Sequence, residues 1–482
     1  MSLASKETKQ LTINPLIFRE YDIRGVASVD LSDAFAKTLG LAYAKYLTRK
    51  LAVEKSTKLT VAVGKDCRLS SDRYEKALIE GLCLGGLNVT RLGLCPTPVT
   101  YFSLFHLDLD GAIMITASHN PPNQNGFKIC VGQQSIYGNQ IQELKTLMES
   151  NPEPAREKGS ISDFDIISAY SVYHKSQFSA LKGKKIVIDC GNGMASVIAS
   201  KLLKSFGVKV IELFCELDGT FPNHVPDPTV IDNITSLTKA VKENHADFGV
   251  GFDGDADRIG VVDENGRLIP GDELMVIFSR EVLSANPGST IVSEVKSSSR
   301  LFEDIKNRGG TPLMSKVGHS LIKAKMKETG ALLGGELSGH VCFADRYFGF
   351  DDAIYATLRL LEISNKTSGP LSSLLNNLPA SFSTPELRLP FKDDIKFKLV
   401  EKVKLILLNN PYLDKFKFTD IDGLRIDFED GWGLIRASNT QPVLTFRFEA
   451  QSKNRLSEIK LIFENATNEA CKQIEQPLPR FN

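Results

Sequence analysis

Three segments of the chain repeat one pattern of apolar and polar positions. Each begins with a short apolar run, passes through a polar loop into an amphipathic stretch, and returns through glycine to a second apolar run. The apolar runs have the length and β-branched content of buried strands, and the amphipathic stretches have the period of helices. The segments are residues 59–93, 184–214 and 289–319.

Strands and helices that alternate at this spacing predict βαβ units with a mostly parallel sheet, and therefore the α/β class. Three occurrences of the pattern predict three similar α/β domains with mixed sheets. After about residue 380 the pattern changes to a smaller α+β domain, with helices near 397–408 and 454–474 and hairpin turns at 421–423 and 429–431. The predicted domains are residues 1–160, 161–267, 268–379 and 380–482.

The composition is that of a globular chain able to bury several cores. Of the 482 residues, 42% are hydrophobic and 24% are charged, and Lys+Arg equals Asp+Glu at 58 each. Because no overall field attracts polyanions, nucleic acid and membrane partners are not expected. The start has no apolar signal segment, and the eight cysteines are scattered without a CxxC pair, which predicts a cytoplasmic protein with reduced, buried thiols.

The apolar run at 112–115 ends in a turn-rich loop that carries Ser118, His119 and Asn120 and leads to Lys128. Ligands in α/β proteins bind at such strand ends. A Ser-His pair taken alone is more often a local turn, but here it stands with a rigid Pro-Pro pair and a lysine. The loop therefore raises the hypothesis that Ser118 attacks or carries a group.

A carboxylate loop lies at 253–257, where Asp253, Asp255 and Asp257 alternate with small residues. Alternate carboxylates on one short turn converge on a hard divalent cation such as Mg²⁺. An EF-hand loop is a poor alternative, because Arg258 occupies the position that needs glycine and the flanks alternate like strands. An acidic surface turn is the remaining alternative, although three aspartates this close repel one another without a cation.

Further loops carry groups suited to a phosphorylated sugar. Glu336 and Ser338 alternate in an extended loop and can chelate vicinal hydroxyls, although a solvated edge strand shows the same pattern. The stretch 436–442 offers an arginine, hydroxyls and backbone amides as a phosphate cradle. The Gly-Asn-Gly at 191–193 suggests a dinucleotide loop, but GxGxxG is absent because residue 196 is Ser.

Taken in order, five motifs resemble the signature loops of the α-D-phosphohexomutases, and most closely the bacterial phosphomannomutase/phosphoglucomutase group. They are FREYDIRG, TASHNPPNQNGFK, DGDADRIG, GGELSGH and RASNTQP, and the resemblance runs from about residue 16 to the end of the sequence. It implies four domains around a central cleft, with one signature loop from each. One departure is Val317, where the closest relatives have Thr, which puts a hydroxyl contact there in doubt.

The resemblance implies a role for each matching position. Ser118 would be the phosphoserine, and its phosphate would hold Mg²⁺ together with Asp253, Asp255 and Asp257. Catalytic groups would be Ser118, His119, Lys128, His319 and Arg24, with His319 and Lys128 the candidates for general acid or base. Substrate would be bound by Tyr21, Arg258, Lys296, Glu336, Ser338, His340, Arg436, Ser438, Asn439 and Thr440.

The implied reaction moves a phosphoryl group between the 1- and 6-positions of mannose or glucose phosphates through a hexose 1,6-bisphosphate, in a monomeric enzyme. A phosphoserine is itself a phosphoryl donor, which explains why no activating Ser-His-Asp relay accompanies Ser118. Phosphoglucosamine mutase is the alternative within the class, although GGELSGH and RASNTQP argue against it. A Mg²⁺-dependent sugar phosphatase and a catalytically silent sugar-phosphate-binding protein are the alternatives outside it.

Overall fold

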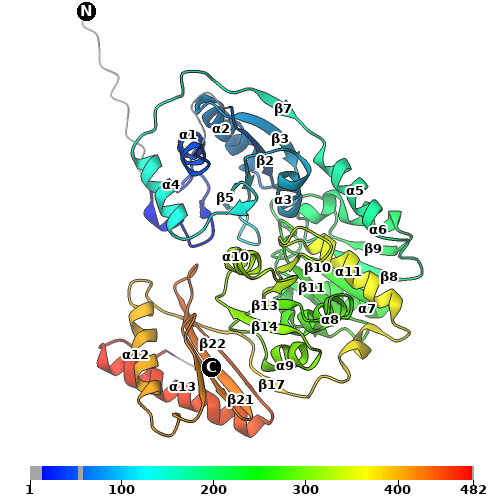
Figure 1. Cartoon of the computed structure of the whole chain (residues 1–482), viewed down its shortest axis with the longest axis vertical. Helices are drawn as coiled ribbons and strands as arrows, with labels where there is room; N and C mark the ends of the chain where they lie inside the picture. Colours follow the sequence, from blue (N-terminus) through cyan, green and yellow to red (C-terminus); the bar gives the residue numbers. More distant parts are fainter. Residues whose placement is uncertain (1–12, 53–57, 480–482) are drawn as a thin grey trace, which may run out of the picture. The chain divides into compact units, whose positions relative to one another are not determined.

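The computed structural model describes residues 13–52 and 58–479, which form two compact units (Figure 1). The first unit contains residues up to 269 together with 339–341 and 350–371, and the second contains the rest. Each unit has two β-sheets with helices packed on them. Three α/β regions and an antiparallel C-terminal region confirm the predicted fold class.

The first sheet has the order β1-β5-β4-β2-β3-β7, with β6 paired to β5. Strands β4, β2, β3 and β7 are parallel, whereas β1, β5 and β4 are antiparallel neighbours, so the sheet is mixed. The strands are β1 (Ile23–Val26), β2 (Thr60–Lys65), β3 (Asn88–Leu94), β4 (Gly111–Ile115), β5 (Gln124–Val131), β6 (Gln134–Ser135) and β7 (Ile161–Asp163).

Helices flank this sheet and start at recognisable caps. The Ser32 hydroxyl accepts a hydrogen bond from the Phe35 amide at the start of the first helix, which satisfies one of its otherwise unpaired amides. The helices of this region are η1 (Pro15–Ile17), α1 (Asp33–Lys50), α2 (Ser71–Leu84), α3 (Thr97–His106), α4 (Asn139–Glu149) and α5 (Ile166–Gln177).

The second sheet also lies in the first unit and has the order β12-β11-β10-β8-β9. Its strands β10, β8 and β9 are parallel, and β11 returns antiparallel to β10 through the aspartate loop. The strands are β8 (Lys185–Asp189), β9 (Lys209–Leu213), β10 (Phe248–Phe252), β11 (Ile259–Asp263) and β12 (Leu268–Ile269). The helices are η2 (Met194–Val197), α6 (Ala199–Ser205), η3 (Ile231–Ile234), α7 (Thr235–Glu243) and α11 (Ala353–Lys366).

The second unit begins with the third sheet, of order β14-β13-β15-β16, in which β13 is parallel to β14 and β15. Its strands are β13 (Thr290–Glu294), β14 (Thr311–Ser315), β15 (Leu333–Gly335) and β16 (Val341–Phe343). Its helices are α8 (Gly271–Ala285), α9 (Ser299–Asn307) and α10 (His319–Thr329).

The C-terminal sheet is antiparallel, with the order β17-β22-β21-β20-β19 and β18 paired to β22. A two-residue turn joins β20 to β21 at the second predicted hairpin, because Phe428 pairs with Gly431. The strands are β17 (Phe382–Ser383), β18 (Leu387–Pro390), β19 (Lys417–Thr419), β20 (Leu424–Phe428), β21 (Gly431–Ala437) and β22 (Val443–Ala450). The helices are η4 (Leu371–Leu375), α12 (Lys396–Leu408) and α13 (Lys453–Gln473), of which the last two match the predicted pair.

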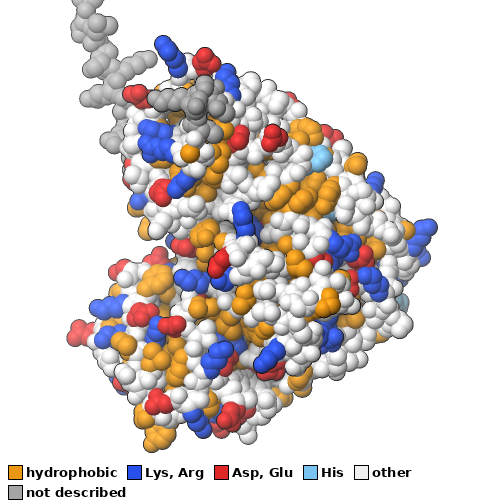
Figure 2. Space-filling view, in the orientation of Figure 1, with side chains coloured by type: hydrophobic (Ala, Val, Ile, Leu, Met, Phe, Trp, Pro, Cys, Tyr) orange, Lys and Arg blue, Asp and Glu red, His pale blue; other side chains and the backbone are white. Residues whose placement is uncertain are grey.

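Figure 2 shows positive and negative side chains interspersed on the face in view, as expected from a net charge of zero. Within residues 13–52 and 58–479, no helix has both the length and the apolar character needed to cross a membrane.

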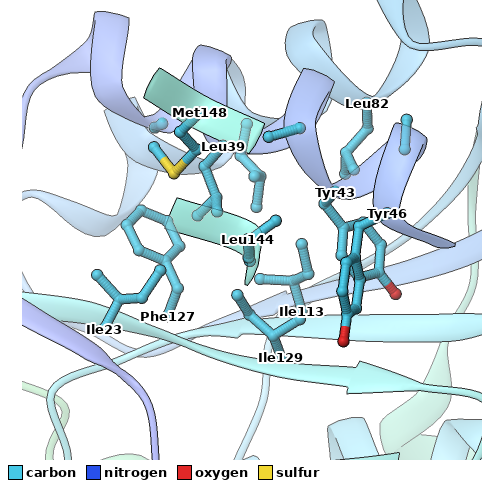
Figure 3. Close-up of a cluster of buried hydrophobic side chains, with 14 of the residues drawn as sticks. Ile23, Leu39, Tyr43, Tyr46, Leu82, Ile113, Phe127, Ile129, Leu144 and Met148 are labelled. Atoms are coloured by element: carbon cyan, nitrogen blue, oxygen red, sulfur yellow. The ribbon is translucent and has the colours of Figure 1, made fainter. Parts of the chain in front are cut away.

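A large hydrophobic core lies between the first sheet and helices α1, α2 and α4 (Figure 3). Tyr43 of α1 and Phe127 of β5 are fully buried there, and the Tyr43 hydroxyl donates to the Cys130 carbonyl 2.5 Å away. Each such aromatic side chain contributes about 1.5–3 kcal/mol through the apolar surface that it removes from water. This core fixes β4 and β5, between which the Ser118 loop lies.

The predicted domain boundaries are untested and remain a prediction. Two elements nevertheless pair beyond them. Strand β7, after the boundary at residue 160, pairs with β3 of the first sheet. Helix α11, inside the predicted third domain, belongs to the first unit and contacts β11.

Candidate active site

Ser118 lies in the loop between β4 and β5 and is 1% exposed. Its φ of 53° is in the left-handed region, which a non-glycine residue adopts only when its surroundings hold it there. The Thr116 hydroxyl accepts a hydrogen bond from the Ser118 amide at 2.9 Å. The loop therefore presents the Ser118 hydroxyl in one fixed direction.

Arg68, in the loop after β2, holds the backbone of the Ser118 loop in place. Its buried guanidinium donates to four backbone carbonyls, those of Ser118, Asn120, Pro121 and Gln124, at 2.6–3.0 Å. The planar fork of arginine suits several acceptors at once. The sequence analysis missed this residue, because an arginine in a polar loop carries no signal of its partners.

The aspartate loop joins β10 to β11, so its flanks are strands as predicted, and Asp253, Asp255 and Asp257 are fully buried. The Ser118 hydroxyl donates to Asp253 Oδ2 at 2.7 Å. The two loops approach so closely at Gly254 that a Cβ there would lie 2.4 Å from the Ser118 carbonyl oxygen. The structure thus brings the predicted nucleophile and the predicted metal ligands together.

Lys128 of β5 is the cation among these carboxylates. Its ammonium lies 2.7 Å from Asp255 Oδ2 and also contacts Asp257. Burial alone would lower the pKa of Lys128, but the two carboxylates outweigh it and hold that pKa above its usual value. Burial likewise opposes ionisation of Asp255, yet Lys128 keeps its pKa below the ordinary range.

The pKa of the third aspartate, Asp253, is shifted in the opposite direction from that of Asp255. Burial, and then the charges of Asp255 and Asp257, raise the pKa of Asp253. The Thr97 hydroxyl at the start of α3 donates to Asp255 Oδ2 at 2.5 Å and was also missed from the sequence. Its signal was weak, because Thr97 lies in an unremarkable Pro-Thr-Pro stretch far from the motifs.

The carboxylate set fits a divalent metal ion. The Lys128 ammonium contacts one oxygen of Asp255 and one of Asp257, and Oδ1 of Asp255 and of Asp257 are buried without a hydrogen-bond partner among the described residues. One oxygen from each aspartate lies within 4.8 Å of the others. Oxygen-only donors in this arrangement are those that Mg²⁺ prefers. The structure therefore contains a buried acidic site suited to a divalent cation.

Arg258 and His340 form a second layer beside the aspartates. Arg258 Nε donates to His340 Nε2 at 2.9 Å, while His340 Nδ1 lies 2.8 Å from Asp351 Oδ2 and 3.5 Å from Asp257 Oδ1. His340 shares the loop between β15 and β16 with Glu336 and Ser338, and it belongs to the first unit whereas those two residues belong to the second. Asp351, which the sequence analysis did not select, supports the imidazole.

His119 and Arg24 complete the first-unit group. His119 Nδ1 lies 3.1 Å from the Ser118 hydroxyl, and burial followed by the charges of Arg258 and Arg24 lowers the pKa of His119 well below its usual value. Its imidazole is therefore neutral at pH 7. Arg24 of β1 donates to Asp22 at 2.7 Å and to Asn120 Oδ1 at 3.1 Å, and half-buried Tyr21 lies two residues before the start of this strand.

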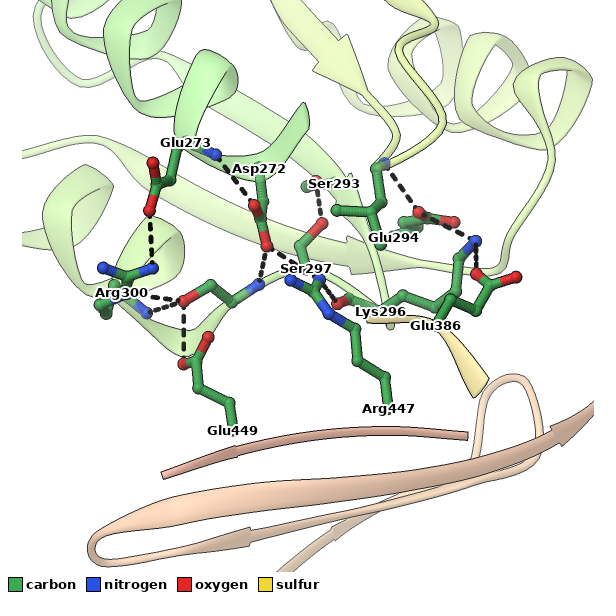
Figure 4. Close-up of polar contacts among 12 residues, drawn as sticks. Asp272, Glu273, Ser293, Glu294, Lys296, Ser297, Arg300, Glu386, Arg447 and Glu449 are labelled. Carbon is green, nitrogen blue, oxygen red and sulfur yellow. Dashed lines mark hydrogen bonds and ion pairs between the residues drawn. The ribbon is translucent and has the colours of Figure 1, made fainter. Parts of the chain in front are cut away.

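In the second unit, Lys296 follows β13 and lies between two glutamates (Figure 4). Its ammonium is 2.6 Å from Glu386 Oε2 and 3.5 Å from Glu294 Oε1. Burial raises the pKa of Glu294 to about 8 despite Lys296, whereas Lys296 outweighs burial at Glu386 and lowers the pKa of that carboxyl. Neither glutamate was predicted from sequence.

Two arginines of the C-terminal sheet hold the backbone of the Lys296 loop. Arg447 donates to Asp272 Oδ2 at 2.9 Å and to the Lys296 carbonyl (Figure 4). Arg425 donates to the carbonyls of Val295 and Ser297 at 2.8 and 2.7 Å, and its guanidinium stacks 3.9 Å from the ring centroid of Trp432. The position of Lys296 therefore depends on the C-terminal sheet.

A hydrogen bond links the Glu336 side chain to the backbone of Gly318, the residue before His319. Glu336, 3% exposed, accepts a hydrogen bond at 2.5 Å from the Gly318 amide, and His319 is the first residue of α10. The Val317 amide donates to Asp422 Oδ2 at 3.0 Å. Asp422 also accepts from Arg436 Nε at 3.1 Å, so one carboxylate joins the His319 loop to the predicted phosphate cradle.

The cradle lies at the end of β21. Arg436 and Ser438 are buried, Asn439 is half-buried and Thr440 is exposed. We predicted free backbone amides for a phosphate, but the Thr440 and Gln441 amides are directed at the Ser438 hydroxyl, 3.3 and 3.2 Å away. Buried Lys396 donates to the Gln441 carbonyl at 2.8 Å and stabilises this turn.

Comparison with known proteins agrees with this geometry. Four family models match the chain, described as phosphoglucomutase/phosphomannomutase alpha/beta/alpha domains I, II and III and the C-terminal domain. They cover residues 15–155, 167–266, 270–382 and 386–466.

Relatives of known name are similar over nearly the whole chain. A phosphomannomutase/phosphoglucomutase from Pseudomonas aeruginosa is 43% identical over 471 residues, which is 98% of each chain. A phosphoglucomutase from Neisseria gonorrhoeae is 41% identical over 93% of this chain and 96% of its own. A crystal structure of a phosphoglucomutase/phosphomannomutase family protein from Burkholderia thailandensis has a TM-score of 0.89 at 39% identity, covering 97% of this chain and all of that one.

The fold and the site define a phosphohexomutase, an isomerase that moves phosphate within a hexose phosphate. The chain belongs to the phosphoglucomutase/phosphomannomutase family. The predicted family and the predicted class of reaction are confirmed.

Proposed function

We propose that the protein interconverts the 1- and 6-phosphates of mannose, glucose or both, with Ser118 as phosphate carrier and a hexose 1,6-bisphosphate as intermediate. The observation that carries the proposal is the hydrogen bond of 2.7 Å between the Ser118 hydroxyl and Asp253, inside a buried carboxylate set. A resting serine hydroxyl in this position has no strong base, because the neighbouring imidazole also faces two arginines. Phosphoryl donation from a phosphoserine does not require one.

Asp253, Asp255 and Asp257, together with the phosphorylated Ser118, would hold Mg²⁺. The ion supplies charge stabilisation for the oxygens of the moving phosphoryl group. Lys128, with its raised pKa, stays a cation and stabilises the same charge, so it acts electrostatically and not as a base. Arg258 and Arg24 add positive charge, and Tyr21, three residues before Arg24 in the sequence, would contact the substrate.

The neutral His119 positions the Ser118 hydroxyl through the contact at 3.1 Å. His340 positions Arg258, because it accepts from the guanidinium on one ring nitrogen and approaches Asp351 with the other. This leaves His319 as our candidate for the general acid or base that exchanges a proton with the sugar hydroxyl.

Residues of the second unit would bind the sugar and the phosphate that does not transfer. Glu336 and Ser338 would read hydroxyls, with Glu336 accepting from them once it releases the Gly318 amide. Arg436, Ser438, Asn439 and Thr440 would bind the phosphate, and Lys296 supplies a buried positive charge. A cradle that grips either phosphate of the bisphosphate lets the same Ser118 serve both halves of the reaction.

Mass spectrometry of the intact protein and of its peptides tests the carrier assignment. We expect one phosphate on Ser118 in a fraction of the purified protein, and loss of both the phosphate and the mutase activity in Ser118→Ala. Parallel assays with mannose 1-phosphate and glucose 1-phosphate then rank the substrates, and glucosamine 1-phosphate checks the alternative. Near-normal turnover of Ser118→Ala would contradict the proposal, and release of inorganic phosphate faster than isomer formation would show a phosphatase.

A further inference from the structure

The loop at 191–193, which the sequence marked by its Gly-Asn-Gly and which the proposed function does not use, is flanked by a close pair of thiols. Cys190 follows β8, Cys215 follows the parallel neighbour β9, and their sulfur atoms are 3.2 Å apart. Cys190 is fully buried, whereas Cys215 is partly exposed. Both sulfurs are thus within reach of a disulfide after a small side-chain rotation.

The same loop touches the aspartate loop. The Met194 amide donates to the Gly254 carbonyl at 2.9 Å. Gly193 approaches so closely that a Cβ there would lie 2.6 Å from the Gly254 carbonyl oxygen. Gly254 lies between Asp253 and Asp255 in the chain. Because the 191–194 backbone packs directly against Gly254, a shift of that backbone would displace the carboxylates.

Hydrogen bonds join this loop and Cys190 to residues 213 and 214, which precede Cys215. The Cys190 amide donates to the Leu213 carbonyl at 3.1 Å, and the Asn192 amide donates to the Phe214 carbonyl at 2.8 Å. Asn192 and Phe214 both have φ in the left-handed region, at 60° and 50°, so this backbone is strained before any bond forms between the sulfurs.

We propose that Cys190 and Cys215 are a redox-active thiol pair, which low-molecular-weight disulfides convert reversibly to an intramolecular disulfide, and that this bond lowers turnover by displacing the aspartate loop. The effect on turnover rests on the proposed function, whereas the disulfide does not. In a reducing compartment such a pair is normally reduced and responds when the thiol–disulfide ratio changes.

The exchange has two balanced steps. The thiolate of Cys215 attacks the small disulfide, whose S–S bond breaks, and one small thiol leaves while a mixed disulfide forms on Cys215. Cys190 then gives its proton to solvent and attacks the Cys215 sulfur, expelling the second small thiol. In total two protein thiols are oxidised and one small disulfide is reduced to two thiols.

The order of the two steps follows from their surroundings. Contact with the Cys215 thiol and burial raise the pKa of Cys190, so this sulfur is seldom a thiolate and is shielded from reagents. Cys215 is the accessible one and reacts first. Cys190 acts as the resolving thiol, helped by a partner already at contact distance.

The test treats the full-length reduced protein with glutathione disulfide over a range of glutathione ratios, blocks the remaining thiols by alkylation, and maps peptides without reduction. We expect a loss of two thiols from the eight in the sequence and one linked pair of peptides containing Cys190 and Cys215. Cys190→Ser and Cys190→Ala should instead accumulate a stable mixed disulfide on Cys215. Cys215→Ser should form neither, and Cys83→Ser, altered at a distant site, should behave like the natural sequence.

The proposal would be overturned if the natural protein formed only mixed disulfides. It would also be overturned if the folded protein formed no disulfide at a glutathione ratio that fully oxidises the unfolded chain.

A second experiment compares kcat before and after oxidation. We expect a fall of about tenfold or more, because small misplacements of catalytic groups cost this much, with recovery in dithiothreitol and no fall in Cys215→Ser. A linked, fully active enzyme would overturn the coupling to the aspartate loop, while absence of mutase activity in every reduced form would refute the proposed function and leave the peptide result intact.

Discussion

Two buried lysines among the described residues each lie between two acids, and the two sites differ in how the acids are arranged. Lys128 contacts Asp255 and Asp257, and each of these aspartates keeps a buried oxygen without a hydrogen-bond partner among the described residues. Lys296 lies between Glu294 and Glu386. Glu294 Oε1 also accepts from the Leu337 amide at 2.8 Å, and Glu294 Oε2 is likewise buried without a hydrogen-bond partner in the described part of the chain.

The difference lies in the spacing of the carboxylates. The aspartates are alternate residues of one turn and converge on one point, so their charges demand a further cation. Glu294 comes from β13 and Glu386 from the segment before β18. Burial raises the pKa of Glu294 to about 8, so this side chain keeps its proton at pH 7. Similar residue pairs thus give a carboxylate set suited to a metal ion in one unit and, in our proposal, a lysine that binds an anion in the other.

Removal of bound metal ions should show the largest functional difference between the aspartate site and the Lys296 site. We expect chelation followed by gel filtration to abolish mutase activity, since the aspartate set is built for a cation, and Mg²⁺ to restore it. Activity and metal content by mass spectrometry are the measurements. Full activity in protein shown to be metal-free would refute the metal assignment.

Asp255→Asn should have the next largest effect. The change keeps shape but removes the carboxylate shared by Lys128 and the metal, so we expect kcat to fall by about a thousandfold, as when preorganised charge is lost. Glu386→Gln is the matched change at Lys296, and we expect it to lower kcat by less than about tenfold. Equal losses in the two variants would erase the distinction between the sites.

Arg436→Ala should act on binding instead of chemistry. We expect KM for the hexose phosphate to rise roughly tenfold to a hundredfold, and to rise more than in Asp255→Ala, because in our proposal the arginine binds the phosphate that does not transfer. Arg436→Lys keeps the positive charge but loses the planar fork of the guanidinium, so we expect its KM to lie between those of the natural protein and Arg436→Ala. The same rise of KM in Asp255→Ala would mean that the cradle is misassigned.

Glu294→Gln should have the smallest effect, seen in the pH dependence of stability. The pKa of Glu294 is raised from 4.5 to about 8 in the folded protein, so its protonated form favours folding below pH 4.5 and this contribution is lost as pH rises through about 8. Lys296, Glu336 and Glu386 face the same group.

Thermal unfolding of the natural protein and Glu294→Gln between pH 5 and 9 measures this contribution. We expect the Tm of the natural protein to fall toward pH 9 relative to that of the variant by a few degrees. Parallel Tm curves would show that Glu294 is ionised throughout.

The sequence predicted those parts of the site that are local in the chain. Asp253, Asp255 and Asp257 share one turn, and Ser118 follows a strand that the hydrophobic pattern identifies, so motif and periodicity were sufficient. Family resemblance implied that the Ser118 phosphate and the three aspartates hold one metal ion, and in the structure the Ser118 hydroxyl donates to Asp253.

The supporting residues could not be predicted, because their partners are distant in sequence. Arg68 binds carbonyls about 50 residues further on, and Arg425 binds carbonyls about 130 residues earlier. A buried arginine and a surface arginine look alike until the chain is folded. Likewise, the proton held by Glu294 depends on burial and on a lysine and two other acids that only the folded chain assembles.

Trp432 offers a use that differs from its structural role. It is the one tryptophan of the sequence, its ring is stacked by Arg425 and its indole N–H donates to Glu449 at 3.1 Å. Glu449 also accepts from Ser298, two residues after Lys296. The tryptophan fluorescence of this protein therefore arises from one fixed point beside the Lys296 loop, and it gives a label-free optical signal for any event that separates the C-terminal sheet from that loop.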